Sequence, residues 1–278
     1  MEIFVTLIAL GFLQVWGSQN PLHRDAWYRF WIRRLEAMGK LNLELRNLLI
    51  VLVPVMLLAL VAHLLNEQSV WLLLPLSVVV LLYSFGRGEF FEIVREYTQA
   101  CYVEDWESAT SRARRFNVVT THLPQNSWPQ LHRLVFDEAG YRGFERMFAV
   151  LFWFFVLGPI GALMYRLVFI RANERPEDAF IQRWLWLMEW PAVRCLSLTF
   201  ALTGNFSGCV EQMRGALFDR DRSTIAVLSP AILGALLVSD DVQADCEITR
   251  KELTLMSKLY QRSLWFWLAA ISLVYLIA

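Results

Sequence analysis

The sequence contains apolar runs that are long enough to cross a lipid bilayer as helices. Residues 48–65 and 70–85 form two such runs, and only residues 66–69 separate them. A hydrocarbon core about 30 Å thick needs roughly 20 apolar residues in a helix. Because backbone groups in lipid must be paired within their own segment, each run is expected to be helical. The two runs therefore predict a transmembrane helical hairpin.

Two further runs, residues 148–170 and 264–278, are also expected to span the membrane. The first contains Gly158 and Pro159 near its middle, where a proline kinks a helix. With 56% hydrophobic and only 19% charged residues, the composition suits a membrane protein better than a soluble enzyme. The predicted fold is an all-α, polytopic membrane protein with four or five transmembrane helices and helical cytoplasmic segments. We expect residues 1–278 to form one domain.

The positions of lysine and arginine predict the side of the membrane that each segment occupies, because these residues concentrate in cytoplasmic loops. Residues 17–47 contain six of them and residues 86–147 contain eight, whereas the linker 66–69 contains none. Both flanks of the hairpin are therefore expected to be cytoplasmic. A third crossing by residues 148–170 would place residues 171–183 on the outer side.

Residues 184–203 leave the number of crossings open. A fifth crossing there would return the seven basic side chains of residues 205–263 to the cytoplasm, which charge counting favours. Glu189 and Arg194 would each cost roughly 2.5–3.5 kcal/mol at the middle of the bilayer, which favours four crossings. Pro191 is expected to break a helix in this segment.

The polar segments are predicted to be helical as well. The apolar residues of the segment 89–116 lie near helical spacing, which predicts one long amphipathic helix. Ser127 is a predicted N-cap for a helix that starts at Trp128. The 26 basic and 26 acidic residues cancel, so net charge gives no argument for a nucleic-acid partner.

Charged residues at both ends of the run 148–170 form the first candidate ligand-binding site. The run is preceded by Arg142, Glu145 and Arg146, and Tyr165 and Arg166 lie near its far end. One interpretation is a site for an anion or a protein partner at the membrane face. The other is a set of basic anchors at the interface with one snorkelling arginine.

Glu189 and Arg194 form the second candidate site. Either they pair inside the membrane beside a ligand, or their segment lies flat and both charges meet lipid headgroups. His23 is the third candidate, because a histidine beside charged residues can titrate near neutral pH. The alternative for His23 is a solvated loop.

No catalytic residue, cofactor or metal site is predicted. The sequence lacks the phosphate-binding loop, the dinucleotide-binding fingerprint, the nucleophile elbow and the zinc-protease motif. Its four cysteines have no metal-ligand spacing. Enzyme activity is therefore left open and is not the leading expectation.

Several of these residues occur in strings that resemble the AmpE family of membrane proteins, in matching order over nearly the whole chain. The strings are FERMFAVLFW at 144–153, GPIGALMYR at 158–166, WPAVR at 190–194 and ALTG at 201–204. His23 with Arg24, and Gly86 with Arg87, also fit the family. Arg87 joins the candidate ligand-binding residues on this ground.

The resemblance implies an inner-membrane protein of Gram-negative bacteria with a regulatory role in β-lactamase induction and peptidoglycan recycling. It implies a functional link to the cytoplasmic amidase AmpD, and so a signalling role in antibiotic resistance. The expected partners are membrane lipid and a muropeptide-related ligand or a protein bound at the cytoplasmic face.

AmpE proteins are in turn distantly similar to the CobD/CbiB cobinamide synthases. An alternative function is therefore a membrane enzyme on that scaffold which acts on an unknown amphiphile, with Glu145 and Arg194 as polar anchors. Most of the carboxylate and amide groups of those enzymes have no counterpart here. A transporter is a third interpretation, although four or five spans are few for that function and no inverted repeat is visible.

Overall fold

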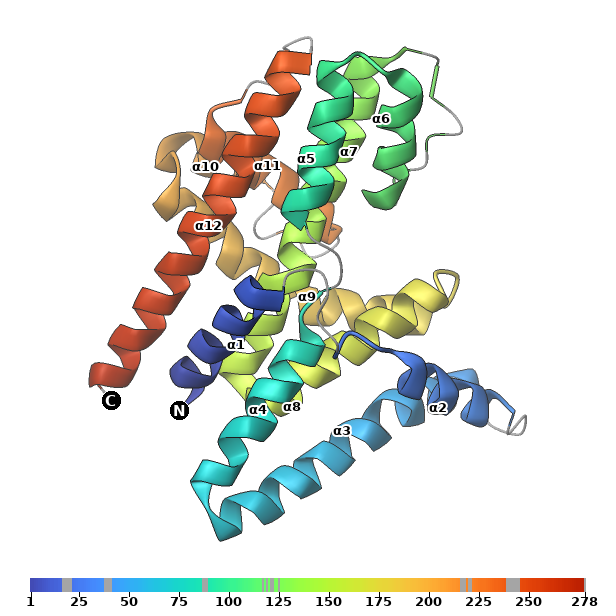
Figure 1. The fold of residues 1–278 in the computed structure, drawn as a ribbon, viewed down its shortest axis with the longest axis vertical. Coiled ribbons are helices and arrows are strands. Elements are labelled where there is room, and N and C mark those ends of the chain that lie inside the picture. Colours follow the sequence, from blue (N-terminus) through green and yellow to red (C-terminus); the bar gives the residue numbers. More distant parts are fainter. Residues whose placement is uncertain are drawn as a thin grey trace. The chain divides into compact units, whose positions relative to one another are not determined.

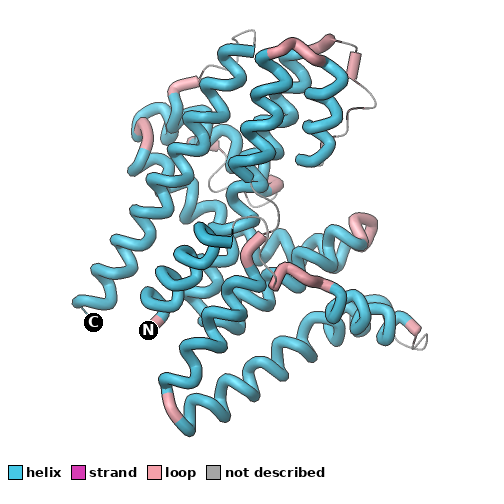
Figure 2. The backbone as a smooth tube through the Cα atoms, in the orientation of Figure 1, coloured by secondary structure: helices cyan, strands magenta, loops and turns pink. Residues whose placement is uncertain are grey.

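The computed structural model describes residues 1–16, 22–37, 42–86, 90–116, 118, 120, 123–124, 126–215, 219, 222–238 and 246–277. Every regular element in these residues is a helix and none is a strand, so the predicted all-α class is confirmed (Figure 2). By contact, the chain divides into two compact units, each assembled from two separate stretches of sequence. The expectation of a single domain stays a prediction.

The first unit comprises Met1–Arg87 and Ala149–Glu189. Its helices are α1 (Glu2–Trp16), α2 (Ala26–Glu36), α3 (Leu43–Gln68), α4 (Val70–Ser84), α8 (Ala149–Glu174) and the first part of α9 (Ala179–Thr203) (Figure 1).

The helices α3 and α4 form the predicted hairpin, which Figure 1 shows at the lower edge of the view. The connection is made at Ser69, whose hydroxyl accepts a hydrogen bond from the backbone N–H of Trp71 at 3.3 Å and so caps α4. At the other end of the hairpin, Glu44 lies in the first turn of α3, where a negative charge is favourable beside the helix dipole.

The helix α8 is broken at Gly158, which has φ 64° and ψ −154°. Only glycine adopts this backbone conformation readily. Pro159 follows and starts a second helical segment, where its missing N–H is not needed. A Cβ atom on Gly161 would overlap the carbonyl oxygen of Trp153, eight residues earlier. In a straight helix eight residues rise about 12 Å, so the chain folds back at Gly158 instead of bending slightly.

Two helices in the described part of the chain are long and apolar enough to cross a membrane. They are Leu43–Glu67, which lies within α3, and Trp128–Glu174, which includes α8. Three shorter helices are also apolar: Glu2–Trp16, Trp71–Ser84 and Thr224–Leu236.

The second unit comprises Gly88–Phe148 and Trp190–Ala278. It contains α5 (Phe90–Tyr102), α6 (Trp106–Ala113), a 3₁₀ turn (Arg114–Phe116), α7 (Trp128–Gly143), a π-helical turn (Phe144–Phe148), the rest of α9, α10 (Phe206–Met213), α11 (Thr224–Leu236) and α12 (Cys246–Ile277). The buried Tyr260 joins α12 to α7, because its hydroxyl donates to the carbonyl of Gly140 at 2.6 Å.

The long helix predicted over residues 89–116 is wrong, because two helices occupy this segment. Glu104 adopts a positive φ of 55°, and the Asp105 carboxylate accepts from the backbone N–H of Ser108 at 3.0 Å, which caps α6. The helix predicted from Trp128 begins at that residue, although the side chain of Ser127 makes no capping bond.

The predicted break at Pro191 is also wrong, because α9 runs from Ala179 to Thr203 through this proline. A proline inside a helix leaves backbone carbonyls of the preceding turn without their usual donors. The carbonyl that loses its donor is that of Leu187, four residues before Pro191. The next carbonyl, that of Met188, accepts a hydrogen bond from the indole N–H of Trp153 at 3.0 Å.

Candidate functional site

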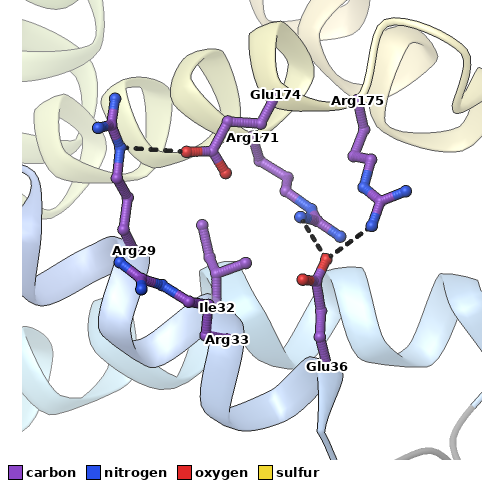
Figure 3. Close-up of a pocket in the computed structure, with 7 residues that line it drawn as sticks. All are labelled: Arg29, Ile32, Arg33, Glu36, Arg171, Glu174 and Arg175. Atoms are coloured by element: carbon purple, nitrogen blue, oxygen red, sulfur yellow. Dashed lines mark hydrogen bonds and ion pairs between the residues drawn. The ribbon is translucent and has the colours of Figure 1, made fainter.

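A hollow lined by charged side chains lies in the first unit, between α2 and the end of α8. This cavity, which we name the α2–α8 cavity, has a volume of about 210 Å³. Figure 3 shows the residues that line it: Arg29, Ile32, Arg33 and Glu36 from α2, Arg171 and Glu174 from α8, and Arg175, which directly follows α8.

Arg171 is the central residue of this cavity, with only 1% of its side chain exposed. Its Nη1 donates to the Glu36 carboxylate at 3.0 Å, and its Nε donates to the side-chain carbonyl of Asn47 at 3.1 Å. The Asn47 amide in turn donates to the Asp178 carboxylate at 2.5 Å. Asp178 also accepts from the backbone N–H of Phe180 at 3.0 Å and so caps α9. One network thus joins α2, α3, α8 and α9.

Helix periodicity explains how α2 presents these side chains. Residues 29, 33 and 36 are three or four apart and therefore share one face of α2. Arg171 and Glu174 are three apart on α8, and Arg175 directly follows that helix. The buried face of α2 fixes its position, because the Tyr28 hydroxyl donates to the carbonyl of Leu167 at 3.1 Å. At its start, Asp25 accepts from the Tyr83 hydroxyl at 3.2 Å.

The cavity carries a positive excess, because four arginines face two glutamates. Burial by itself raises the pKa of the Glu36 carboxyl, but the hydrogen bonds and charges of Arg171 and then Arg175 outweigh it and hold that pKa below its ordinary range. Arg29 and Glu174 form a longer pair at 3.4 Å. The guanidinium of Arg33 has no hydrogen bond or ion pair with any described residue.

Not all donors of this network are satisfied. The Nη2 atom of Arg171 is buried and has no hydrogen-bond partner among the described residues. A buried donor without an acceptor is costly, more so when it is charged. The arrangement therefore suits an additional negative group better than a closed structural ion pair.

The network also corrects the predicted sidedness. Charge counting places residues 17–47 and 171–183 on opposite sides of a bilayer. Direct hydrogen bonds from Asn47 to Asp178, and from Arg171 to Glu36, exclude this arrangement. The prediction fails because it treats residues 148–170 as one crossing helix, whereas the chain folds back at Gly158.

In the first unit, the structure brings two of the predicted site residues together. Tyr165 and Glu189 are both buried, and the Tyr165 hydroxyl donates to the Glu189 carboxylate at 3.2 Å. Arg166 is buried with its guanidinium 5.4 Å from the centre of the Phe169 ring. His23 lies within hydrogen-bond distance, 3.2 Å, of the carbonyl of Leu82.

The second unit contains three further predicted residues. Arg142 is 3.6 Å from Glu145, which is buried in the π-helical turn, and 3.6 Å from Glu138. Arg194 donates to the carbonyl of Asp219 at 2.7 Å. Its guanidinium also stacks 3.9 Å from the centre of the Trp190 ring.

Two further points concern Arg87 and metal binding. Arg87 lies outside the described residues. No group of three or more histidine, cysteine, aspartate or glutamate side chains that could hold a metal occurs in the part of the chain that the structure describes.

The sequence interpretation missed the α2–α8 cavity, although a signal for it was present. The α2 segment AWYRFWIRRLE carries its arginines and glutamate on an amphipathic helix, and the apolar run that ends α8 is followed by Arg171, Glu174 and Arg175.

Comparisons with family models, with curated proteins and with solved structures each return no match for the chain.

Proposed function

We propose that this chain is a multi-pass protein of the bacterial inner membrane that binds a ligand at the α2–α8 cavity on the cytoplasmic face and thereby modulates β-lactamase induction. The observation that carries the binding part is the cationic cavity built around the buried Arg171, in which the guanidinium of Arg33 has no partner among the described residues. The regulatory part rests on the resemblance to AmpE proteins, which also motivates the functional link to AmpD and to peptidoglycan recycling.

The surface of α3 supports the membrane part of the proposal. Only 22% of the apolar window in Leu43–Glu67 is buried inside the protein. Large apolar side chains of this helix remain exposed, including Leu52, Met56, Leu57, Leu60 and Leu64. Because apolar area in contact with water costs about 25 cal/mol per Å², a continuous face of this kind is stable in lipid and unfavourable in water.

The break in α8 supports one arrangement of the polar segments. Trp153 lies before the break and Tyr165 after it, yet both bond to neighbouring residues of α9, Met188 and Glu189. We infer that α8 enters the membrane from the cytoplasmic side and returns to it, with Gly158 at the turn. Residues 171–183 then share the cytoplasmic side with α2, as the positive-inside rule favours.

A deletion strain tests the regulatory role. We expect loss of the protein to change inducible β-lactamase activity or the level of peptidoglycan recycling intermediates, and wild-type protein supplied from a plasmid to restore both. Arg33→Gln should fail to restore them, whereas Arg34→Gln should succeed, because Arg34 is exposed on the same helix and does not line the cavity.

Two outcomes would contradict the proposal. A deletion that leaves both β-lactamase induction and recycling intermediates unchanged would refute the regulatory role. Full restoration by Arg33→Gln, at wild-type protein levels in the membrane, would show that regulation does not use the α2–α8 cavity.

A further inference from the structure

The chemistry of the α2–α8 cavity indicates the class of ligand that it takes. We propose that this cavity binds a phosphate group, presented by the headgroup of an anionic amphiphile at the membrane surface or supplied as free phosphate. The inference rests on the ligand-binding part of the proposed function and names the ligand's chemistry.

The arginine donors of the cavity match the oxygen acceptors of a phosphate. Arginine presents planar, forked donors that pair with phosphate oxygens. Among the described residues, the guanidinium of Arg33 has no hydrogen bond or ion pair and the Nη2 of Arg171 has no acceptor. The guanidinium of Arg29 contacts Glu174 at 3.4 Å. A phosphate carries enough oxygens to accept from several of these groups at once.

The site is preorganised, because the protein's own side chains hold it in position before a ligand binds. Arg171 is fixed by Glu36 and by Asn47, and Asn47 is itself held by Asp178. Little conformational entropy is then lost when an anion binds beside it. The exposed Arg33 can close over the anion from α2.

The volume of the cavity limits the size of the group that it can hold. Sites that enclose a drug-sized ligand have volumes of roughly 300–1,000 Å³. The α2–α8 cavity, at about 210 Å³, has room for a phosphate with a small substituent. The rest of a larger ligand must therefore lie outside the cavity.

An exposed aromatic side chain lies next to Arg33 on α2. Phe30 is 67% exposed and precedes Arg33 by three residues, and Trp27, which is 45% exposed, lies one turn before Phe30. Exposed aromatic side chains among basic residues are typical of helices that lie in the membrane interface. Acyl chains of a lipid would contact this face while the phosphate reaches the arginines.

The two glutamates of the cavity act as internal competitors. Glu36 occupies Arg171 and Arg175, and Glu174 occupies Arg29, when no phosphate is bound. Removing the charge of Glu174 should therefore free Arg29 and tighten binding. A purely structural ion-pair cluster would show no such gain.

The experiment uses the purified full chain in a neutral detergent, titrated with three probes. The probes are dihexanoyl phosphatidic acid, dihexanoyl phosphatidylcholine and inorganic phosphate, and isothermal titration calorimetry measures each dissociation constant. We expect phosphatidic acid to bind and phosphatidylcholine not to bind. Tighter binding of phosphatidic acid than of inorganic phosphate would assign the ligand to a lipid headgroup, and equal binding would assign it to free phosphate.

Variants decide whether binding occurs in the cavity. Arg33→Gln should weaken binding of the anionic probe about tenfold, as expected for one lost hydrogen bond between charged groups. The matched control Arg34→Gln should change it less than threefold, and Glu174→Gln should strengthen it. The proposal is overturned if neither anionic probe binds, or if Arg33→Gln and Arg34→Gln weaken binding equally.

These results separate the inference from the proposed function. Phosphate binding in the cavity together with an unaffected β-lactamase response would remove the regulatory role and keep the site. Absence of phosphate binding, with Arg33→Gln still defective in the cell, would keep a ligand site of different chemistry and overturn the phosphate assignment.

Discussion

Arg171 and Arg175 donate to the same oxygen of Glu36, yet their replacement should have very different effects on stability. Arg171 is 1% exposed and also holds Asn47, whereas Arg175 is 43% exposed. Arg171→Met keeps most of the apolar stem but removes a hydrogen bond between charged groups, worth roughly 1.5–3 kcal/mol, and one to Asn47, worth about 1 kcal/mol. The expected loss of unfolding free energy is about 3 kcal/mol.

Arg175→Met is the matched control. An exposed ion pair contributes roughly 0–1 kcal/mol, so this variant should lose no more than that. Both variants can be unfolded reversibly by raising the fraction of sodium dodecyl sulfate in mixed micelles, with far-ultraviolet circular dichroism as the readout. Equal losses for the two variants, or a loss below about 1 kcal/mol for Arg171→Met, would refute the assignment of Arg171 as the centre of the network.

Three further predictions follow from the fold. In the same unfolding assay Gly158→Ala should cost about 1–3 kcal/mol through backbone strain, and Gly161→Ala should also destabilise because its Cβ would overlap backbone, whereas Gly11→Ala, with open space around it, should be neutral or slightly stabilising. Because the pKa of Glu36 is lowered from its ordinary 4.5, its ion pairs should stabilise the protein fully above that pH and be lost as the pH falls through the lowered pKa. A series of thermal-unfolding measurements from pH 6 to about 3 would detect this loss. If Glu36→Gln lost stability over this range as steeply as the wild type, the result would contradict the prediction. Burial raises the pKa of the Cys209 thiol to about 11, so maleimide at neutral pH should modify Cys209 only after denaturation; rapid labelling of the folded protein would contradict its buried position.

The hairpin of α3 and α4 could be predicted from the sequence because its signal is local. Two uncharged runs separated by a short polar linker predict two apolar helices joined by a tight connection. The break in α8 was only partly predictable. Pro159 predicts a kink. The positive φ of Gly158 and the close approach of Gly161 to Trp153 depend on the packing of α9 against the parts of α8 before and after Gly158.

The α2–α8 cavity could not be derived from local patterns because its partners are distant in sequence. Glu36 and Arg171 are 135 residues apart, and no local pattern in residues 171–175 pairs their charges with those of α2. By contrast, Arg142 and Glu145 are three residues apart on a helical segment, so their proximity follows from helix geometry alone. The contact between Tyr165 and Glu189 lies between these cases, since both were candidates but nothing in the sequence paired them.

In the proposed arrangement, α2 and the end of α8 lie on the same, cytoplasmic side of the membrane. Single cysteines introduced by Arg34→Cys, Glu177→Cys and Glu67→Cys into a chain without its native cysteines test this with a membrane-impermeant maleimide. Glu177 and Glu67 have side chains 65% and 64% exposed, so both positions are accessible. We predict that positions 34 and 177 are labelled in inverted vesicles and protected in intact spheroplasts. Position 67, in the last turn of α3 beside the hairpin connection, should show the opposite pattern. Labelling of position 177 in spheroplasts, with position 34 protected, would contradict the account.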